Sequence, residues 1–171
     1  MKKLAVVFLS LSMLVTLVVP IGLEAGNISK VGYIDLAKIF DQYNRTKNSD
    51  SNLEREWKDK QGEIEKMKGA ITSLKDELEL RSESAKEGKQ AEIDKKIKKL
   101  QDFSKEAKDE LTSKRSEMVR EILKDIDDTI NEYGKSKGYD LILNERVLLY
   151  RNKVLDLTDK IVKILNDKYK K

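Results

Sequence analysis

The strongest constraint in this sequence is a heptad pattern that runs twice through its middle. In the first run the apolar residues alternate in spacings of three and four, at Leu53, Trp57, Ile64, Met67, Ile71, Leu74 and Leu78. The second run keeps the same alternation at Ile93, Ile97, Leu100, Ala107, Leu111 and Met118. This alternation is typical of a helix that packs along one seam against another helix. We therefore assign these residues a structural role as the seam.

The two runs are out of phase, which indicates two helices rather than one. On a single continuous helix the a positions of the two runs would be five residues out of phase, whereas a stutter or stammer shifts the phase by four or three. A reversal near Ala85 and Lys86 instead pairs Leu78 with Ile93 and Leu53 with Met118. We expect an antiparallel hairpin over residues 46–133 with its tip at about residues 82–90, where Gly88 can take a positive φ.

Two lysines occupy seam positions in this register. Lys60 is expected to face Leu111, and Lys114 is expected to face Trp57. The aliphatic stem of each lysine can lie along the seam while its ammonium group reaches water. Each arm would be roughly 50 Å long, so the hairpin is a projection rather than a compact domain.

The N-terminal stretch predicts a secretory signal peptide over residues 1–25. Lys2 and Lys3 precede an apolar run that extends to Val19, Pro20 ends it, and Ala25 is the expected cleavage site. An uncleaved membrane anchor is the alternative, although the apolar run is short for a membrane span.

Residues 26–45 and 134–171 predict a small β-rich body built from both ends of the chain. Residues 31–35 are expected to form a strand, followed by a helix that Asp35 caps. Residues 139–144 and 147–151 are expected to form a β-hairpin through Asn144, and a last helix begins near Asp156. Whether residues 44–52 continue the first helix or bend into the arm is left open by the pattern.

A body of this size buries little apolar surface alone, so we expect a homo-oligomer. Its second strand region is apolar on both faces, and only one face can cover the helices of the same chain. The candidate residues of the oligomer body are Ile34, Leu141, Leu143, Val147 and Leu149. The fold class is therefore α+β: a small sheet body that carries a long helical hairpin, in an oligomer.

The composition argues against an enzyme. The chain has 39% charged and 6% aromatic residues and neither cysteine nor histidine, which removes thiol nucleophiles and the usual Ser-His and Cys-His catalytic pairs. We expect no catalytic residue, no cofactor and no metal site.

A group of lysines near the tip is the one basic cluster, made of Lys86, Lys89, Lys95, Lys96, Lys98 and Lys99. Glu92 and Asp94 interrupt it and no aromatic residue is interleaved, so we expect no nucleic-acid partner. The cluster is a candidate contact for client chains or for a membrane surface.

The two ends of the chain resemble the Skp (OmpH-like) family of periplasmic chaperones. The resemblance rests on Val31-Gly32-Tyr33-Ile34-Asp35 with Ile39-Phe40, on Tyr139-Asp140-Leu141-Ile142-Leu143, and on Leu149-Tyr150 and Asp156-Leu157-Thr158. It implies a homotrimer whose helical tentacles surround a cavity. It also implies an ATP-independent holdase that binds unfolded outer-membrane proteins in the periplasm. The alternative is a coiled-coil spacer or scaffold of the cell envelope, which should present an apolar or pairing surface at its tip.

Overall fold

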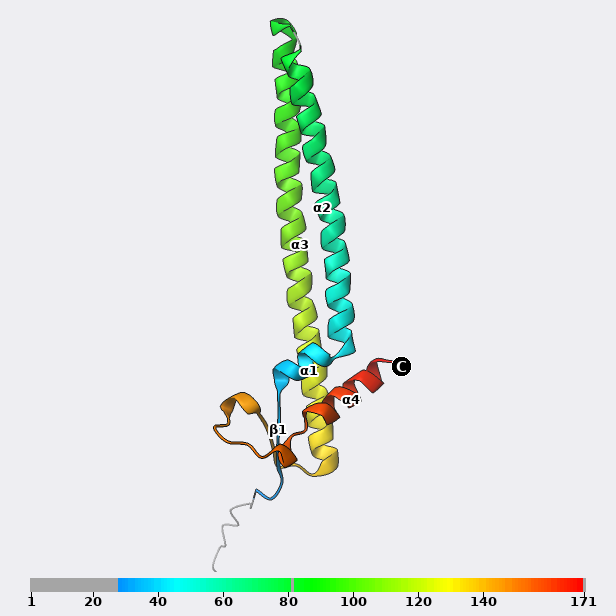
Figure 1. The fold of residues 1–171 in the computed structure, drawn as a ribbon, viewed down its shortest axis with the longest axis vertical. Coiled ribbons are helices and arrows are strands. Elements are labelled where there is room, and N and C mark those ends of the chain that lie inside the picture. The colour runs from blue at the N-terminus through cyan, green and yellow to red at the C-terminus, as the bar shows by residue number, and fades with distance from the viewer. Residues whose placement is uncertain (1–27, 81, 171) are drawn as a thin grey trace, which may run out of the picture.

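A computed structural model describes residues 28–80 and 82–170 of the chain. The predicted signal peptide lies outside the described residues. The element order is β1 (Val31–Ile34), α1 (Leu36–Gln42), α2 (Asn44–Glu79), α3 (Glu83–Lys137), β2 (Leu141–Asn144), two short 3-10 turns, η1 (Glu145–Val147) and η2 (Lys153–Leu155), and α4 (Thr158–Tyr169). Helices α2 and α3 form a long arm, and the other elements gather at its root (Figure 1).

The arm consists of α2 and α3 lying side by side, with the chain reversing between them (Figure 1). Lys114 pairs with Glu56 at 2.7 Å and Lys60 pairs with Glu110 at 3.1 Å, so residues early in α2 lie beside residues late in α3. These pairs lie within one residue of the register that the seam predicts. The heptad pattern therefore identifies which parts of the two helices meet.

The reversal lies earlier in the chain than the sequence predicts. Helix α2 ends at Glu79, and α3 begins at Glu83 after an extended backbone at Ser82. Gly88, expected in the turn, lies inside α3. Ser82 is a preferred residue for the position before a helix, and the polar residues that follow it can all be accommodated in a helix, so the helix starts before the glycine.

A single strand pairing joins the two ends of the described chain. Strand β1 pairs in parallel with β2, with Val31 opposite Leu141 and Ile34 opposite Asn144. The predicted β-hairpin is wrong: within the described residues β2 has only β1 as its partner strand, and residues 145–147 form a 3-10 turn. The Asn144 side chain accepts a hydrogen bond from the Arg146 backbone at 3.3 Å, and this local bond turns the chain away from a second strand.

The core of the body lies where α1, α4 and the root of α3 meet beside the sheet. Its buried side chains are Ile34, Ile39, Tyr43, Ile122, Ile126, Leu157, Ile161 and Leu165. A Cβ at Gly32 would lie 2.4 Å from the Leu157 Cδ1 atom, so a larger residue there would force the buried Leu157 side chain to move. Long-range packing between the two ends of the chain therefore builds the body.

Local capping bonds position the elements around this core. The Asp35 side chain accepts a hydrogen bond from the Lys38 backbone at 2.9 Å, which confirms the predicted cap of α1. The backbone is extended at Tyr43, so residues 44–52 begin a new helix, α2, rather than continuing α1. Gly138 ends α3 with a positive φ of 66°, a conformation that favours glycine.

None of the helices among the described residues is both long enough and apolar enough to span a membrane.

Candidate functional site

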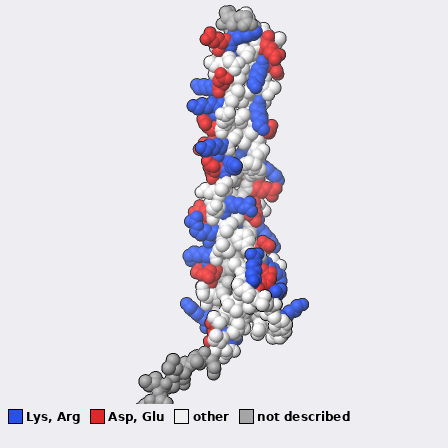
Figure 2. All heavy atoms as spheres, turned by 90° about the vertical axis from the view of Figure 1, so that its left-hand side faces the viewer, with Lys and Arg blue, Asp and Glu red and all other residues white. Residues whose placement is uncertain are grey.

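The most prominent surface of the body is an apolar loop that spans residues 145–155, between β2 and α4. Four of its apolar side chains are strongly exposed, namely Val147 (70%), Leu149 (108%), Tyr150 (85%) and Val154 (83%). Figure 2 views the molecule from the side on which this loop projects. Exposed apolar groups gathered in this way mark an interaction surface.

The loop is held in position at both ends and across its middle. The Asn152 side chain accepts a hydrogen bond from the Val154 backbone at 3.1 Å and so closes the second 3-10 turn. Arg151 pairs with Glu145 at 3.2 Å and lies over the Tyr33 ring at 6.0 Å. At the end of the loop, the Leu157 backbone donates to the Tyr33 carbonyl at 2.9 Å. The exposed side chains are therefore displayed on a fixed scaffold.

The predicted residues of the oligomer body fall into two groups. Leu141, Val147 and Leu149 are exposed, and Leu143 is half-buried. Ile34 lies in the core of this single chain and is 5% exposed, so it offers no surface to a partner. Three of the five candidates thus lie on an open surface, and Tyr150 and Val154 extend this surface beyond the predicted set.

The seam residues of the arm are placed between α2 and α3, with unequal burial. Ile64, Ile71, Ile93 and Ala107 are buried. The half-buried members are Leu53, Met67, Leu74, Leu78, Ile97, Leu100, Leu111 and Met118. Trp57 is the exception, because 41% of it is exposed.

A network of charged side chains crosses the arm at mid-length. Lys114 bridges Glu56 and Glu110 at 2.7 and 2.9 Å, and Lys60 also reaches Glu110 at 3.1 Å. Hydrogen bonds from Lys114 and then Lys60 hold the pKa of Glu110 below its ordinary value. Both seam lysines therefore end on carboxylates of the two helices, and the network joins α2 to α3 outside the apolar contact.

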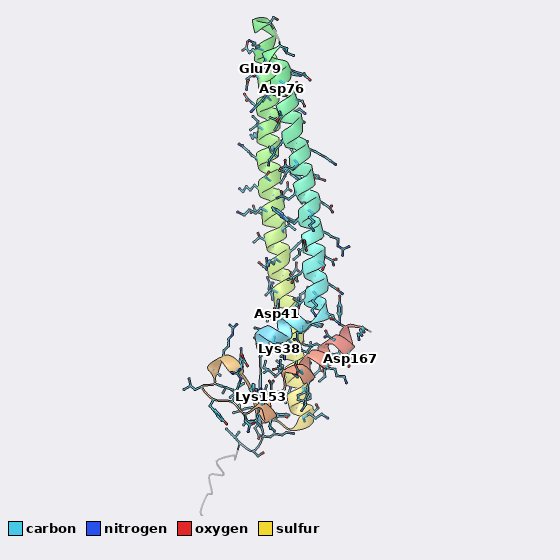
Figure 3. All side chains as sticks on the ribbon, in the orientation of Figure 1. Lys38, Asp41, Asp76, Glu79, Lys153 and Asp167 are labelled. Carbon is cyan, nitrogen blue, oxygen red and sulfur yellow. The ribbon has the colours of Figure 1, made fainter. Side chains whose placement is uncertain are left out.

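The predicted basic tip is mixed in charge. Lys89 pairs with Glu77 at 3.1 Å and with Glu92 at 3.2 Å, and Asp76 and Glu79 lie at the same end of the arm (Figure 3). Lys95, Lys96, Lys98 and Lys99 are exposed, and none of the ion pairs found in the described part of the chain involves them. The free positive charge thus lies on α3 just below the tip.

The profile of the family described as Outer membrane protein (OmpH-like) matches residues 30–165, which include the body and the arm. The chain belongs to this family. The resemblance seen in the sequence is thereby confirmed over most of the chain.

Relatives of this OmpH-like chain carry the name "Chaperone protein Skp". The protein of that name from Blochmanniella pennsylvanica (strain BPEN) is 27% identical over 168 residues, which cover 95% of this chain and 98% of that protein. The one from Vibrio cholerae serotype O1 is 23% identical over 140 residues, with 80% and 83% covered. A solved OmpH-like structure from Caulobacter crescentus CB15 shares the fold, with a TM-score of 0.75 at 15% identity over 81% of this chain and 84% of that one.

One structural feature of this OmpH-like chain was missed by the sequence reasoning: a group of polar contacts at the root of the arm, which we call the clamp. Arg45 of α2 pairs with Glu121 and Asp125 of α3, the latter at 2.6 Å, and the Tyr43 hydroxyl donates to Asp125 at 3.1 Å. Burial, and then the bond to Asp125, raise the pKa of Tyr43 to about 12. The clamp ties the start of α2 to α3 at the root of the arm. Its only sequence signal is an arginine just before the heptad run.

The described residues contain no group of three or more carboxylates placed to hold a metal ion.

Proposed function

We propose that the protein is an ATP-independent holdase chaperone of the periplasm, which binds unfolded outer-membrane protein precursors between helical arms. The observation that carries this proposal is a long charged arm raised on a small body that displays a fixed apolar loop. Membership of the OmpH-like family and relatives named chaperone protein Skp support it.

The architecture suits a chaperone that makes many weak contacts. An unfolded chain has no fixed shape, so a holdase needs extended surface rather than a fitted pocket. The arm offers such a surface, with lysine, arginine, aspartate and glutamate interspersed along its length (Figure 2). Weak contacts also permit release without nucleotide hydrolysis, by transfer of the client to its membrane.

Assembly into a homotrimer, as the family resemblance implies, would set several arms around one cavity. The exposed loop at residues 145–155 and Leu141 of β2 are the surfaces that we assign to this assembly. Covering the loop would remove from water several large apolar side chains, each worth about 1.5–3 kcal/mol when fully buried. The arms would then be antiparallel coiled-coil hairpins that project from a common base.

The exposed lysines near the tip would assist by attraction. Lys95, Lys96, Lys98 and Lys99 would draw acidic client segments or an acidic membrane surface toward the arm. This contact is transient in our proposal, because the lysines are exposed. At physiological ionic strength, salt screens the attraction of such charges over a distance of about 8 Å.

The test is an aggregation assay with a urea-unfolded outer-membrane β-barrel protein and no nucleotide. The protein should keep the client soluble at a near-stoichiometric oligomer ratio, as measured by light scattering. A variant that lacks two heptads from each helix, residues 64–77 and 93–106, should keep its oligomeric mass and lose protection, first for large clients. Protection by neither protein would overturn the chaperone proposal, and equal protection by both would remove the arms from it.

A second candidate function is a coiled-coil spacer of the cell envelope. Leu80, at the end of α2, is 89% exposed and gives the tip one apolar group. A spacer would use this group for end-to-end contact. For a spacer, L80D should abolish self-association or envelope contact, and no client protection is expected. For a holdase, the oligomeric mass should not depend on Leu80.

A further inference from the structure

A small hollow lies on the arm between α2 and α3, on the body side of the charged network. Its volume is about 280 Å³, and it is lined by Asp50, Leu53, Glu54, Trp57, Leu111 and Arg115. Three of these side chains are large and apolar, and they come from both helices. The hollow therefore has an apolar floor inside a surface that is otherwise densely charged.

The hollow lies beside a seam position that a lysine occupies in the predicted register. The heptad register places Lys114 opposite Trp57, but the Lys114 ammonium lies on Glu56 and Glu110 instead. Hydrogen bonds to Glu56 and then Glu110 raise the pKa of Lys114, so it stays charged and held on them. Trp57 is left 41% exposed at a position where the other large seam residues are more deeply covered.

This hollow differs in polarity from a second hollow on the arm. The second hollow, on α3, is lined by Asp102, Lys105, Glu106, Asp109, Glu110 and Ser113, and thus by polar side chains alone. It lies on a single helix and has no apolar floor. It therefore serves as an internal control for the surface near Trp57.

The rim of the Trp57 hollow is asymmetric in charge. Asp50 and Glu54 of α2 contribute two carboxylates, and Arg115 of α3 contributes one guanidinium group. Lys58 pairs with Glu54 at 2.8 Å and keeps the pKa of Glu54 below its ordinary value. Asp50 and Glu54 place two carboxylates on the α2 side of the rim, and this side therefore favours a cation.

We propose that this hollow is a client-contact site, which takes one aromatic or large aliphatic side chain of an unfolded polypeptide flanked by a lysine or arginine. The apolar side chain lies against Trp57, Leu53 and Leu111, and the flanking cation meets Asp50 and Glu54. Tryptophan supplies a large, rigid contact surface, and it is enriched among residues that dominate binding energy. The inference rests on the chaperone function proposed above and identifies a place on the arm where a client binds.

Fluorescence provides a direct test, because Trp57 is the single tryptophan of the chain. The full protein is titrated with short peptides that are otherwise serine and threonine and carry Lys-Phe-Lys, Glu-Phe-Glu or Lys-Ser-Lys at their centre. Lys-Phe-Lys should shift Trp57 emission to shorter wavelength and protect it from acrylamide. It should bind at least about threefold more tightly than Glu-Phe-Glu, which corresponds to a difference in binding free energy of about 0.7 kcal/mol. Lys-Ser-Lys should leave the emission spectrum unchanged.

Variants separate the site from the fold. D50N/E54Q keeps the tryptophan and should remove the preference for Lys-Phe-Lys over Glu-Phe-Glu. W57S should raise the chaperone ratio needed to protect a tryptophan-free unfolded barrel protein, W57F should restore it, and S113A in the polar hollow should have no effect. Helical circular dichroism and oligomeric mass are measured for each variant.

Three outcomes would overturn the inference. The first is unchanged Trp57 emission while the client is held soluble, which would leave the chaperone function standing. The second is equal binding of the lysine- and glutamate-flanked phenylalanine peptides. The third concerns the protein without peptide or client. If acrylamide quenches Trp57 only after this protein is diluted, a second copy of this chain covers the hollow. Loss of protection by the unmodified protein is a different result, because it would refute the proposed function itself.

Discussion

The arm and the body of this protein are stabilised in opposite ways. The body joins residues more than 100 positions apart, as in the pairing of Val31 with Leu141, and its core side chains are almost completely buried. The arm depends on one narrow seam with half-buried leucines and on exposed ion pairs. The comparison indicates a division of labour: non-local packing makes a defined platform, and a thin, locally encoded seam holds an extended surface in the solvent.

The largest expected effect is on assembly through the body. L141D/L149D would place two charges in the surface that we assign to the subunit interface, each at a cost of about 3 kcal/mol or more. We expect monomers by light scattering. The matched control is L80D, which alters another exposed leucine, at the tip, and should leave the mass unchanged. If the double variant keeps its mass, the difference between body and arm does not extend to assembly.

The next effect separates the two regions within one chain. G32V would place side-chain carbons within the space of Leu157 and Tyr139, and overpacking of this kind costs about 2–3 kcal/mol. G69A in α2 would meet no atom within 4 Å and should stabilise the arm by about 0.5–1 kcal/mol, because alanine favours a helix. Urea unfolding followed by circular dichroism measures both. A similar loss in both variants would contradict the view that only the body is tightly packed.

The smallest predicted effect concerns the clamp where the regions meet. Because the Tyr43 pKa is raised to about 12 from 10.0, the folded state favours the protonated phenol. Its contribution to stability is complete below pH 10 and is lost as the pH rises toward 12. The stability difference between the wild type and Y43F should therefore shrink by roughly 1–2 kcal/mol over this range, since one pKa unit corresponds to about 1.4 kcal/mol. If the difference in unfolding free energy between the wild type and Y43F stays constant with pH, the Tyr43 hydroxyl does not contribute to the stability of the clamp.

The same division explains which features the sequence could predict. The seam, the Asp35 cap and the last helix follow from residues close together in the chain, and the register of the arm is predicted to within one residue at Lys60. The sheet could not be predicted in this way. Leu141 to Asn144 have their partner over 100 residues away, while the nearby apolar stretch from Val147 suggested a hairpin.

The candidate site shows the same limit at the level of side chains. Heptad spacing places Lys114 opposite Trp57, but it does not predict that the Lys114 ammonium group pairs with Glu56 and Glu110. The exposed indole and its hollow lie beside this lysine in the predicted register. Likewise, the apolar residues near Leu149 indicated an interaction surface. The turn that holds this surface in place is closed by a hydrogen bond to an asparagine side chain, and the apolar pattern does not reveal such a bond.

The parallel pairing of β1 with β2 also has a consequence for the order of folding. A chain that emerges from its N-terminus presents β1 first, but the partner strand follows only after the whole arm. Helices form within microseconds and need only neighbouring residues, whereas a strand pair that closes so long a loop is slow to form. The arm is therefore expected to fold first and to bring the two strands together, so that the body is completed last. Until then, β1 has an unpaired edge, and the folded arm is what holds the two ends of the body close enough to pair.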